Sequence, residues 1–347
     1  MSVLTRTMKA AVAHDFGDIR IEEVDVPTPG PRDALVRVRA CGICSGDVTP
    51  WYIRKKCPIV LGHEPAGEVV EVGSQVTEYQ PGDRVFFHHH APCFSCRHCR
   101  RGRFNMCETW RSSHLVPGGA AQYVVVPQVN LDGDTLRLPD DMSWADATLI
   151  EPLACVVRAF QRAALQPGDR VAIMGLGVMG QMMARLARHR DAGPILGSDL
   201  VPYRLQKGLE SGLDRAVDVS RESFPEAVRA ATGGEGADLV LVNPTSPKAV
   251  LEGLECAGKG SRVLMFMGPE PGTPLTIDMN HVYFNEIDLV SSYSCGPDDT
   301  REAMRLIHEG VVTAEHVVTH RFPLEAAQEA CDLTSRARES LKVLLEL

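Results

Sequence analysis

The sequence predicts an α/β protein with two domains, a strand-rich N-terminal domain followed by a doubly wound parallel sheet. Three observations predict this fold class. Short runs in the first 90 residues alternate apolar and polar positions, as half-buried strands do. Strands and helices alternate between about residues 154 and 293, which is typical of a parallel sheet covered by helices. A length of 347 residues favours two domains.

The N-terminal domain is predicted to comprise residues 1–153. Its first alternating runs are MKAAVAH, IRIEEVDVP and DALVRVRACGIC. Two further strands are predicted at residues 68–72 and 83–87, and glycine and proline turns separate the runs. A polar, cysteine-rich loop follows at residues 91–118, before GGAAQYVVVP returns to a strand pattern.

The second domain is predicted to comprise residues 154–293. A helical run, PLACVVRAFQRAAL, leads into a short apolar strand at residues 170–174. Further strands are predicted in PILGSD, AVDV, ADLVLVN and SRVLMFMG, with helical runs between them. Residues 294–347 are predicted to hold one helix, DTREAMRLIHEG, and a short end region finishing in LKVLLEL.

Charge and hydropathy exclude several classes of partner. The formal net charge is −9, which argues against a nucleic-acid partner because such proteins carry basic faces. No run approaches the roughly 20 apolar residues of a membrane helix, so we expect no membrane partner. The start, MSVLTRTMKAAVAHD, lacks the apolar segment and cleavage site of a secretory signal, and a cytoplasmic location is predicted.

A glycine-rich turn indicates a dinucleotide site. Gly175, Gly177 and Gly180, with Val178 and Met179 between the last two, form a G-x-G-x-x-G that follows an apolar strand and opens a helix. Such a turn brings backbone amides and a helix N-terminus to a pyrophosphate. Asp199 ends the next strand, where a carboxylate accepts ribose hydroxyls and repels a 2′-phosphate, so NAD is favoured over NADP.

Arg204 lies close enough to Asp199 in the sequence to weaken that preference for NAD. A packing turn in an α/β protein that binds another ligand, or none, is the alternative interpretation of the glycine-rich turn.

Four of the eleven cysteines indicate a metal site. Cys93, Cys96, Cys99 and Cys107 fall within one short loop. Thiols of cytosolic proteins stay reduced, so a cluster of this kind is better explained by a metal than by disulfides. Four thiolates suit a closed, structural zinc site. An iron–sulfur cluster is possible from the ligands alone, but nothing else in the sequence suggests a redox chain.

A second group of metal-ligand residues is scattered along the chain. Cys44, His63, Glu64 and Glu151 together would suit a catalytic zinc with an open coordination position. Taken singly, each has an ordinary structural explanation. His63 could be a hydrogen-bonded core histidine, and Glu151 could be an acidic residue at a helix start.

The order of these motifs resembles the zinc-containing medium-chain dehydrogenase/reductase family. CGIC, GHE, the four-cysteine loop, LIEPL and the G-x-G-x-x-G follow one another as in its sorbitol (polyol) and threonine dehydrogenase branch. The resemblance covers essentially the whole chain. It implies a GroES-like catalytic domain of irregular β-barrel type, to which residues 294–347 return, and a Rossmann coenzyme domain.

The resemblance also implies a set of site residues. Cys44, His63 and Glu64, with Glu151 as a further ligand, match the catalytic zinc positions, and the cysteines of the loop match the structural zinc. Two zinc ions per chain and NAD are therefore expected. An acid at position 151, where simple alcohol dehydrogenases carry cysteine, points to the polyol branch.

The activity implied is hydride transfer between NAD and a secondary alcohol or ketone. Expected substrates are polyols, cyclitols or amino alcohols, with a threonine-type 3-dehydrogenase as an alternative. Relatives assemble through the Rossmann domain, so a homodimer or homotetramer is expected, with residues 285–293 as a candidate exposed sheet edge.

Two departures from the family pattern concern the path by which the substrate proton leaves. The run after Cys44 is Ser45, Gly46, Asp47, Val48, Thr49, so serine and glycine are exchanged and threonine stands where a histidine is expected. The usual relay is therefore absent or rerouted, and Ser45, Thr49, Glu64 or a water chain is expected to replace it. The alternative is that this loop has simply diverged in an ordinary enzyme.

Further residues are predicted to line the substrate pocket. His88, His89 and His90 end a predicted strand, so alternation should place His88 and His90 on one face and His89 on the other. We expect His89 or His90 to contact substrate, unless this is a surface strand end. Other candidates, for which packing is the simpler explanation, are Trp51, Tyr52 and Tyr293.

Two rival functions stay open. The chain could be a reductase of the same superfamily whose metal is only structural, although Cys44, His63, Glu64 and Glu151 argue against that. It could also be a non-catalytic protein that binds zinc or a dinucleotide, with the altered run at Ser45 to Thr49 marking lost chemistry. Metal content separates the first rival, and turnover with NAD separates the second.

Overall fold

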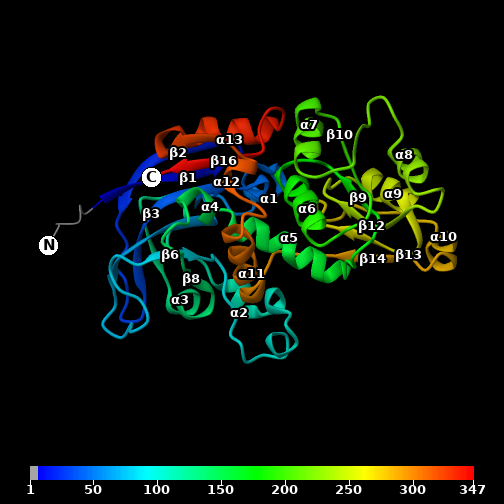
Figure 1. Ribbon diagram of the computed structural model, residues 1–347. Coiled ribbons are helices and arrows are strands. Elements are labelled where there is room, and N and C mark those ends of the chain that lie inside the picture. Colours follow the sequence, from blue (N-terminus) through cyan, green and yellow to red (C-terminus); the bar gives the residue numbers. More distant parts are fainter. Residues whose placement is uncertain (1–6) are drawn as a thin grey trace. The chain divides into compact units, whose positions relative to one another are not determined.

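The computed structural model describes residues 7–347, so the first six residues of the predicted N-terminal domain lie outside the described part (Figure 1). The chain divides into two compact units. One contains the described residues up to Ala154 together with Cys295–Leu347, and the other contains Cys155–Ser294. Helix α5 (Ile150–Ala163) crosses from the first unit into the second.

The second unit is built on a six-stranded parallel sheet. Its strand order is β11-β10-β9-β12-β13-β14, which is the doubly wound order of dinucleotide-binding folds. The strands are β9 (Val171–Met174), β10 (Ile195–Asp199), β11 (Arg215–Asp218), β12 (Ala237–Val242), β13 (Ala257–Met265) and β14 (Asp288–Ser291). Every residue of β9 is buried, as expected for a central strand covered on both faces.

Helices alternate with these strands. They are α6 (Val178–His189), α7 (Pro202–Glu210), α8 (Phe224–Ala231), α9 (Pro247–Cys256) and α10 (Met279–Phe284). Helix α6 packs against β9 and β10, and α9 packs against β9, β12 and β13. The buried side chains between α8, α9 and the sheet include Phe224, Val240 and Leu254.

The first unit contains two sheets. The smaller has the order β2-β1-β4, and the larger has the order β15-β16-β3-β5-β6-β8, with β7 paired to β3. The strands are β1 (Thr7–Asp15), β2 (Asp18–Asp25), β3 (Ala34–Ile43), β4 (Ile59–Val60), β5 (Glu64–Val72), β6 (Arg84–Phe87), β7 (Tyr123–Val126), β8 (Thr135–Arg137), β15 (Val318–Pro323) and β16 (Lys342–Glu346). Strand β16 lies antiparallel beside β3, so the end of the chain is part of this unit.

Short helices connect the strands of the first unit. They are η1 (Ser45–Val48), α1 (Pro50–Arg54), η2 (Cys99–Arg101), η3 (Phe104–Met106), α2 (Glu108–Ser112), α3 (Gln128–Asp134), α4 (Trp144–Ala147), α11 (Pro297–His308), α12 (Ala314–Val317), η4 (Leu324–Ala326) and α13 (Ala327–Arg336). Helix α13 contacts β16 and β2, and it buries Ala327, Ala330 and Cys331 against Val343.

The prediction of one helix after residue 294 is wrong. Besides α11, the structure contains α12, β15 and α13 in this segment. The apolar positions of α13 are mostly alanines and one cysteine, which give a weak periodic signal although they are fully or almost fully buried.

The prediction that His88 and His90 share one face of a strand is also wrong, because it assumed that the strand continues through the three histidines. Strand β6 ends at Phe87, so the alternation rule does not apply to the three histidines. His88 is fully buried, whereas His89 and His90 are both partly exposed and their ring centroids lie 4.1 Å apart.

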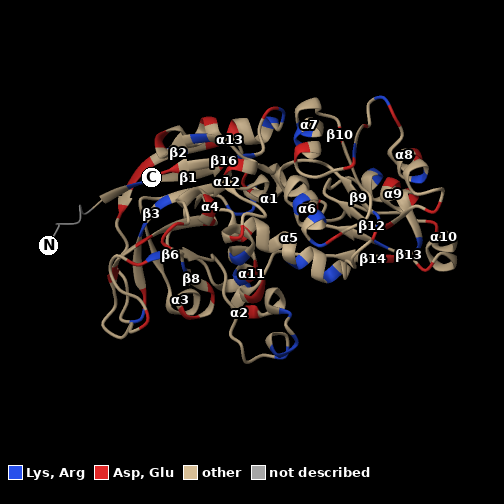
Figure 2. Ribbon diagram, in the orientation of Figure 1, with Lys and Arg blue, Asp and Glu red and all other residues tan. Residues whose placement is uncertain are grey.

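Charged residues of both signs are distributed along both units (Figure 2). Among residues 7–347, every helix is too short or too polar to cross a bilayer.

Candidate metal and dinucleotide sites

The four loop cysteines converge as the sequence predicts. Their sulfur atoms all lie within 4.8 Å of one another. Three of the separations are 3.5 Å for Cys96 to Cys99, 3.6 Å for Cys93 to Cys107 and 3.9 Å for Cys93 to Cys99. A tetrahedron with zinc–sulfur bonds of about 2.3 Å has edges of about 3.8 Å, so the sulfurs already stand at the spacing that zinc requires.

Hydrogen bonds prepare one of these thiols for ligation. The Ser95 hydroxyl and nearby backbone amides lower the pKa of the Cys93 thiol to about 5. The thiolate is the form that binds a metal. Trp110, which is 1% exposed, packs with Cys99 and Cys107 beneath the loop.

Cys44, His63 and Glu64 form a second group of metal donors. One donor atom from each lies within 4.8 Å of the other two. The pairing of β3 with β5 explains the contact, because Gly42 stands opposite Glu64 in the antiparallel register and Cys44 follows β3 directly. Residues 20 positions apart in the sequence therefore share one end of the sheet.

Asp47 orients two members of this group, and the sequence interpretation missed it. Its Oδ1 lies 3.3 Å from Nδ1 of His63, and its Oδ2 accepts a hydrogen bond of 3.1 Å from the Cys44 amide. Burial lowers the pKa of His63, but the charges of Asp47 and Cys44 outweigh it and raise that pKa well above the ordinary value. A carboxylate on Nδ1 leaves Nε2 of His63 available to a metal.

Lys342 is the other residue that the sequence interpretation missed. It begins β16, is 1% exposed, and its ammonium forms an ion pair with Oε2 of Glu64 while donating to the carbonyl of Ile43 at 3.1 Å. Burial lowers the pKa of Lys342, but the Glu64 carboxylate outweighs burial and raises it. A buried cation therefore holds one of the candidate metal donors.

Glu151 lies in a different group. Its carboxylate has a donor atom within 4.8 Å of donor atoms of His88 and His89, and among the described residues it is not part of the Cys44 group. The His89 ring nevertheless lies near the Cys44 group, because its centroid is 5.0 Å from that of the His63 ring. His90 is turned toward the loop, where it bonds the Ser113 carbonyl at 2.6 Å.

The remaining predicted residues occupy varied positions. The Thr49 hydroxyl donates to the Ser45 carbonyl at 2.8 Å, across η1. Trp51 and Tyr52 lie in α1, where Lys55 and Lys56 stand over their respective rings. Tyr293 belongs to the other unit and is 51% exposed.

The glycine-rich turn has the geometry that its sequence predicts. Gly175 has φ of +84°, a left-handed conformation that favours glycine, and its amide bonds the Ser198 carbonyl at 2.8 Å. A Cβ at Gly180 would meet the Gly175 carbonyl oxygen at 2.2 Å, so only glycine allows this close approach. Gly177 is the N-cap of α6, whose first residues are Val178 and Met179.

Asp199 and Arg204 stand beside this turn. Oδ2 of Asp199 accepts the Leu176 amide at 2.8 Å, and Oδ1 accepts the amides of Leu200 and Val201. Arg204 Nη1 lies 3.9 Å from Oδ2. The carboxylate is thus fixed at the end of β10 with a guanidinium nearby.

Both donor sets fit zinc in their chemistry. The loop offers four sulfurs at tetrahedral spacing, and the Cys44 group offers one sulfur, one imidazole and one carboxylate. Three protein ligands are the usual number in a catalytic zinc site, which keeps one position open.

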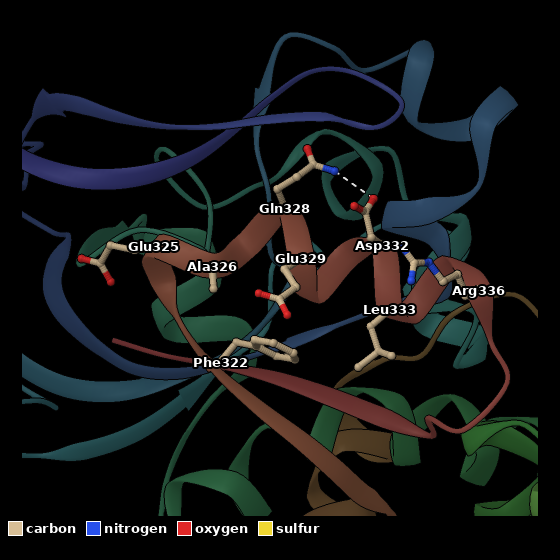
Figure 3. Close-up of a pocket in the computed structure, with 8 residues that line it drawn as sticks. All are labelled: Phe322, Glu325, Ala326, Gln328, Glu329, Asp332, Leu333 and Arg336. Carbon is tan, nitrogen blue, oxygen red and sulfur yellow. Dashed lines mark hydrogen bonds between the residues drawn. The ribbon is translucent and has the colours of Figure 1, made fainter.

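A surface pocket of about 490 Å³ lies elsewhere in the first unit, along α13 (Figure 3). Carboxylates of Glu325, Glu329 and Asp332 and the apolar side chains of Phe322 and Leu333 line it. Its lining contains no thiol or imidazole, so it is distinct from the metal-donor groups.

Fold and site together define a class of protein, a two-unit α/β dehydrogenase with metal-donor sets in one unit and a dinucleotide turn in the other. Comparison with known proteins agrees. Residues 30–140 match the alcohol dehydrogenase GroES-like domain, and residues 178–309 match the zinc-binding dehydrogenase family.

Individual relatives match along nearly the whole chain. Sorbitol dehydrogenase of Bacillus subtilis is 30% identical over 98% of this chain and 97% of its own. L-threonine 3-dehydrogenase of Symbiobacterium thermophilum is 32% identical over 99% of both chains. The crystal structure of a zinc-binding dehydrogenase from Sinorhizobium meliloti bound to NADP is 28% identical, with a TM-score of 0.88 over 99% of this chain and 100% of that one.

The chain belongs to the zinc-binding dehydrogenase family, in which it is similar to the sorbitol and threonine dehydrogenases. The predicted family and the predicted fold class, a GroES-like domain with a Rossmann-type coenzyme domain, are confirmed. The chain is accordingly an oxidoreductase of the zinc-dependent alcohol dehydrogenase type.

Proposed function

We propose that the chain transfers a hydride between NAD and a secondary alcohol or ketone, with a polyol, cyclitol or amino alcohol as substrate. The observation that carries the proposal is the convergence of Cys44, His63 and Glu64 within 4.8 Å, in a chain that also contains the dinucleotide turn. The similarity to sorbitol dehydrogenase supports a polyol, and the similarity to threonine 3-dehydrogenase supports an amino alcohol.

In this proposal, Cys44, His63 and Glu64 hold a catalytic zinc, and the four loop cysteines hold a structural one. When bound, the zinc supplies Lewis-acid polarisation of the substrate oxygen, and the nicotinamide accepts the hydride. Asp47 keeps the His63 ring oriented through Nδ1, and Lys342 restrains the Glu64 carboxylate through their ion pair. Glu151, the predicted further ligand, has its donor atoms beside His88 and His89 and stands outside this group of three.

Ser45 and Thr49 are proposed to carry the substrate proton away in place of the missing histidine. The Thr49 hydroxyl donates its hydrogen to the Ser45 carbonyl. Its oxygen can therefore still accept a hydrogen bond from a neighbouring donor. Thr49→Val preserves the shape of the side chain and removes the hydroxyl. We expect a lower kcat for this variant with little change in zinc content, and an unchanged kcat would remove Thr49 from the path.

NAD rather than NADP is the proposed cofactor. The Asp199 carboxylate is fixed by three backbone amides at the end of β10, where it would repel a 2′-phosphate. Asp199→Ala should raise the KM for NAD and lower that for NADP, and Asp218→Ala, at the paired position of β11, is the matched control. Equal use of both cofactors by the unaltered chain would contradict the proposal.

The domain roles and the assembly are also proposed. Residues 1–153 with 294–347 form the catalytic domain, and residues 154–293 form the coenzyme domain. We propose a homodimer or homotetramer through the edge of the parallel sheet, where β14 has one sheet neighbour and Tyr283 and Phe284 of α10 are more than 70% exposed.

The deciding experiment measures NADH formation by zinc-loaded chain against a panel of polyols, cyclitols, secondary alcohols and threonine. Cys44→Ala should abolish turnover, and Cys57→Ala, which lies outside every metal-donor group of the described residues, should retain it. Turnover confined to threonine would select the amino-alcohol alternative. Silence across the panel, from a chain that binds zinc and NAD, would favour the non-catalytic rival.

A further inference from the structure

Asn243, the residue that follows β12, uses only half of its side-chain amide within the chain. Its Nδ2 donates to the carbonyl oxygen of Gly175 at 2.9 Å. The opposite orientation of the amide would set two acceptor oxygens against each other, so the hydrogen-bond network fixes which atom is Oδ1. Oδ1 is buried and has no hydrogen-bond partner among residues 7–347. Buried polar atoms are normally paired, so this oxygen calls for a donor from outside the chain.

Asn243 lies at the topological switch point of the parallel sheet. Strands β9 and β12 are neighbours at the centre of the sheet, with β10 beyond β9 and β13 beyond β12 (Figure 1). In sheets of this order, ligands bind outside the carboxyl ends of the strands, where the strand order reverses. Gly175 is the first residue after β9 and Asn243 is the first after β12, so both stand at this position.

Asn243 also packs directly against the dinucleotide turn. A Cβ placed on Gly175 would meet Cβ of Asn243 at 3.4 Å and Cδ of Pro244 at 3.3 Å, and a Cβ on Gly180 would lie 3.5 Å from Nδ2. The residue before a proline is restricted to extended backbone, so Pro244 limits the directions that the Asn243 side chain can take. The amide is therefore a fixed part of the wall beside the turn.

The side of the turn on which Asn243 lies indicates which part of a dinucleotide it meets. Asp199, the acid for the adenosine ribose, ends β10 on one side of β9, whereas β12 lies on the other side. A dinucleotide spans the two halves of such a sheet, with its pyrophosphate at the helix N-terminus between them. Asn243 is therefore on the nicotinamide half, where the group next to the pyrophosphate is a ribose with hydroxyl donors.

We propose that Asn243 is a cofactor-binding residue whose Oδ1 accepts a hydrogen bond from a ribose hydroxyl on the nicotinamide half of NAD. The inference rests on the proposed use of NAD. One amide then has two roles, because Nδ2 holds the Gly175 carbonyl while Oδ1 holds the ribose. The ribose is thereby tied to the turn that binds the pyrophosphate, which restricts where the nicotinamide ring can stand.

The test compares ligands that extend to different lengths past the first phosphate. ADP lacks the second ribose, ADP-ribose contains it, and NAD adds the nicotinamide. Their dissociation constants for the full chain are measured by titration calorimetry. Asn243→Leu keeps the branched shape and removes both polar atoms. It should weaken ADP-ribose and NAD by roughly 5- to 100-fold, because a hydroxyl donor loses its acceptor, and it should weaken ADP far less.

Gln181 supplies a matched control for the bracing of the turn. Its Nε2 donates to the Leu176 carbonyl at 2.7 Å and to the Arg204 carbonyl at 3.1 Å, so it braces the same turn from α6. Gln181→Leu should therefore weaken all three ligands to a similar extent. Binding of ADP by Asn243→Leu shows in addition that the turn of that variant is folded.

Several outcomes would overturn the proposal. Equal weakening of ADP and NAD in Asn243→Leu would mean that the amide acts only by bracing the turn. Unchanged binding of all three ligands would remove Asn243 from the site, and a loss confined to NAD would move the contact from the ribose to the nicotinamide. An unaltered chain that binds none of the three would sink the proposed function itself, so the two failures are distinguishable.

Discussion

The ion pair between Lys342 and Glu64 offers a sharp test of how the Cys44 group is built. Lys342→Met keeps the length and the apolar stem of the side chain and removes the ammonium. The two partners are 2% and 1% exposed, so the Glu64 carboxylate would be left buried without its cation. Removing one partner of a buried pair costs about 3–5 kcal/mol of stability.

That free energy translates into a measurable change of melting temperature. For a domain of 150–250 residues, 1 kcal/mol corresponds to about 2–4 °C, and the first unit is of this size. Lys342→Met should therefore lower the midpoint of thermal unfolding by about 6–20 °C, recorded by calorimetry on chain stripped of zinc. Zinc must be absent because it would bind Glu64 in place of the ammonium and raise the midpoint by itself.

A matched control is present in the same unit. Lys9 and Glu325 form an ion pair of 2.8 Å whose side chains are 48% and 55% exposed. Exposed pairs contribute little, so Lys9→Met should shift the midpoint far less. The double variant Lys342→Met with Glu64→Gln should recover part of the loss, because no unpaired carboxylate remains. Equal shifts for Lys342→Met and Lys9→Met would refute the reasoning.

Three further predictions concern the dinucleotide turn, the cysteine loop and the sheet edge. Gly180→Ala should abolish NAD binding in calorimetry, because its Cβ would meet the Gly175 carbonyl oxygen at 2.2 Å, and unchanged binding would show that the turn relaxes. Cys96→Ser should remove one zinc ion and lower the melting temperature, because the closed site loses a thiolate. Mass spectrometry and calorimetry measure the two effects, and retained zinc would exclude the loop as a zinc site. Tyr283→Asp combined with Phe284→Asp should yield monomers in sedimentation, because two charges replace aromatic rings that are 74% and 72% exposed. An unchanged sedimentation coefficient would place the interface elsewhere.

The fold and much of the donor inventory could be predicted from the sequence because their signals are local. The cysteine loop closes within one segment, and the dinucleotide turn needs only its flanking strand and helix. The apolar strands of the second unit are buried on both faces, so their composition alone indicates a parallel sheet. Helix α13 escaped prediction because its buried face consists of small side chains.

The partners of the donors could not be predicted, because they come from distant segments. Lys342 reaches Glu64 only because β16 pairs with β3, and a lone lysine near the end of the chain has no signal of its own. Asp47 is different, since it lies three residues after Cys44, within the run that departs from the family pattern. It could have been found by asking which carboxylate orients His63.

The three consecutive histidines show how two hydrogen bonds to one short helix make identical neighbouring residues behave differently. Asn130 Nδ2 donates to the His88 carbonyl at 3.0 Å, and the His88 amide donates to the Asp134 carbonyl at 3.0 Å. These bonds hold His88 against α3. Strand β6 ends at Phe87, and its alternation of faces does not extend to His88. The side chain of Asp134 then holds the His88 ring through Nδ1. One short helix therefore sets both the backbone and the ring of His88, while His89 is left beside His63 and His90 turns to Ser113.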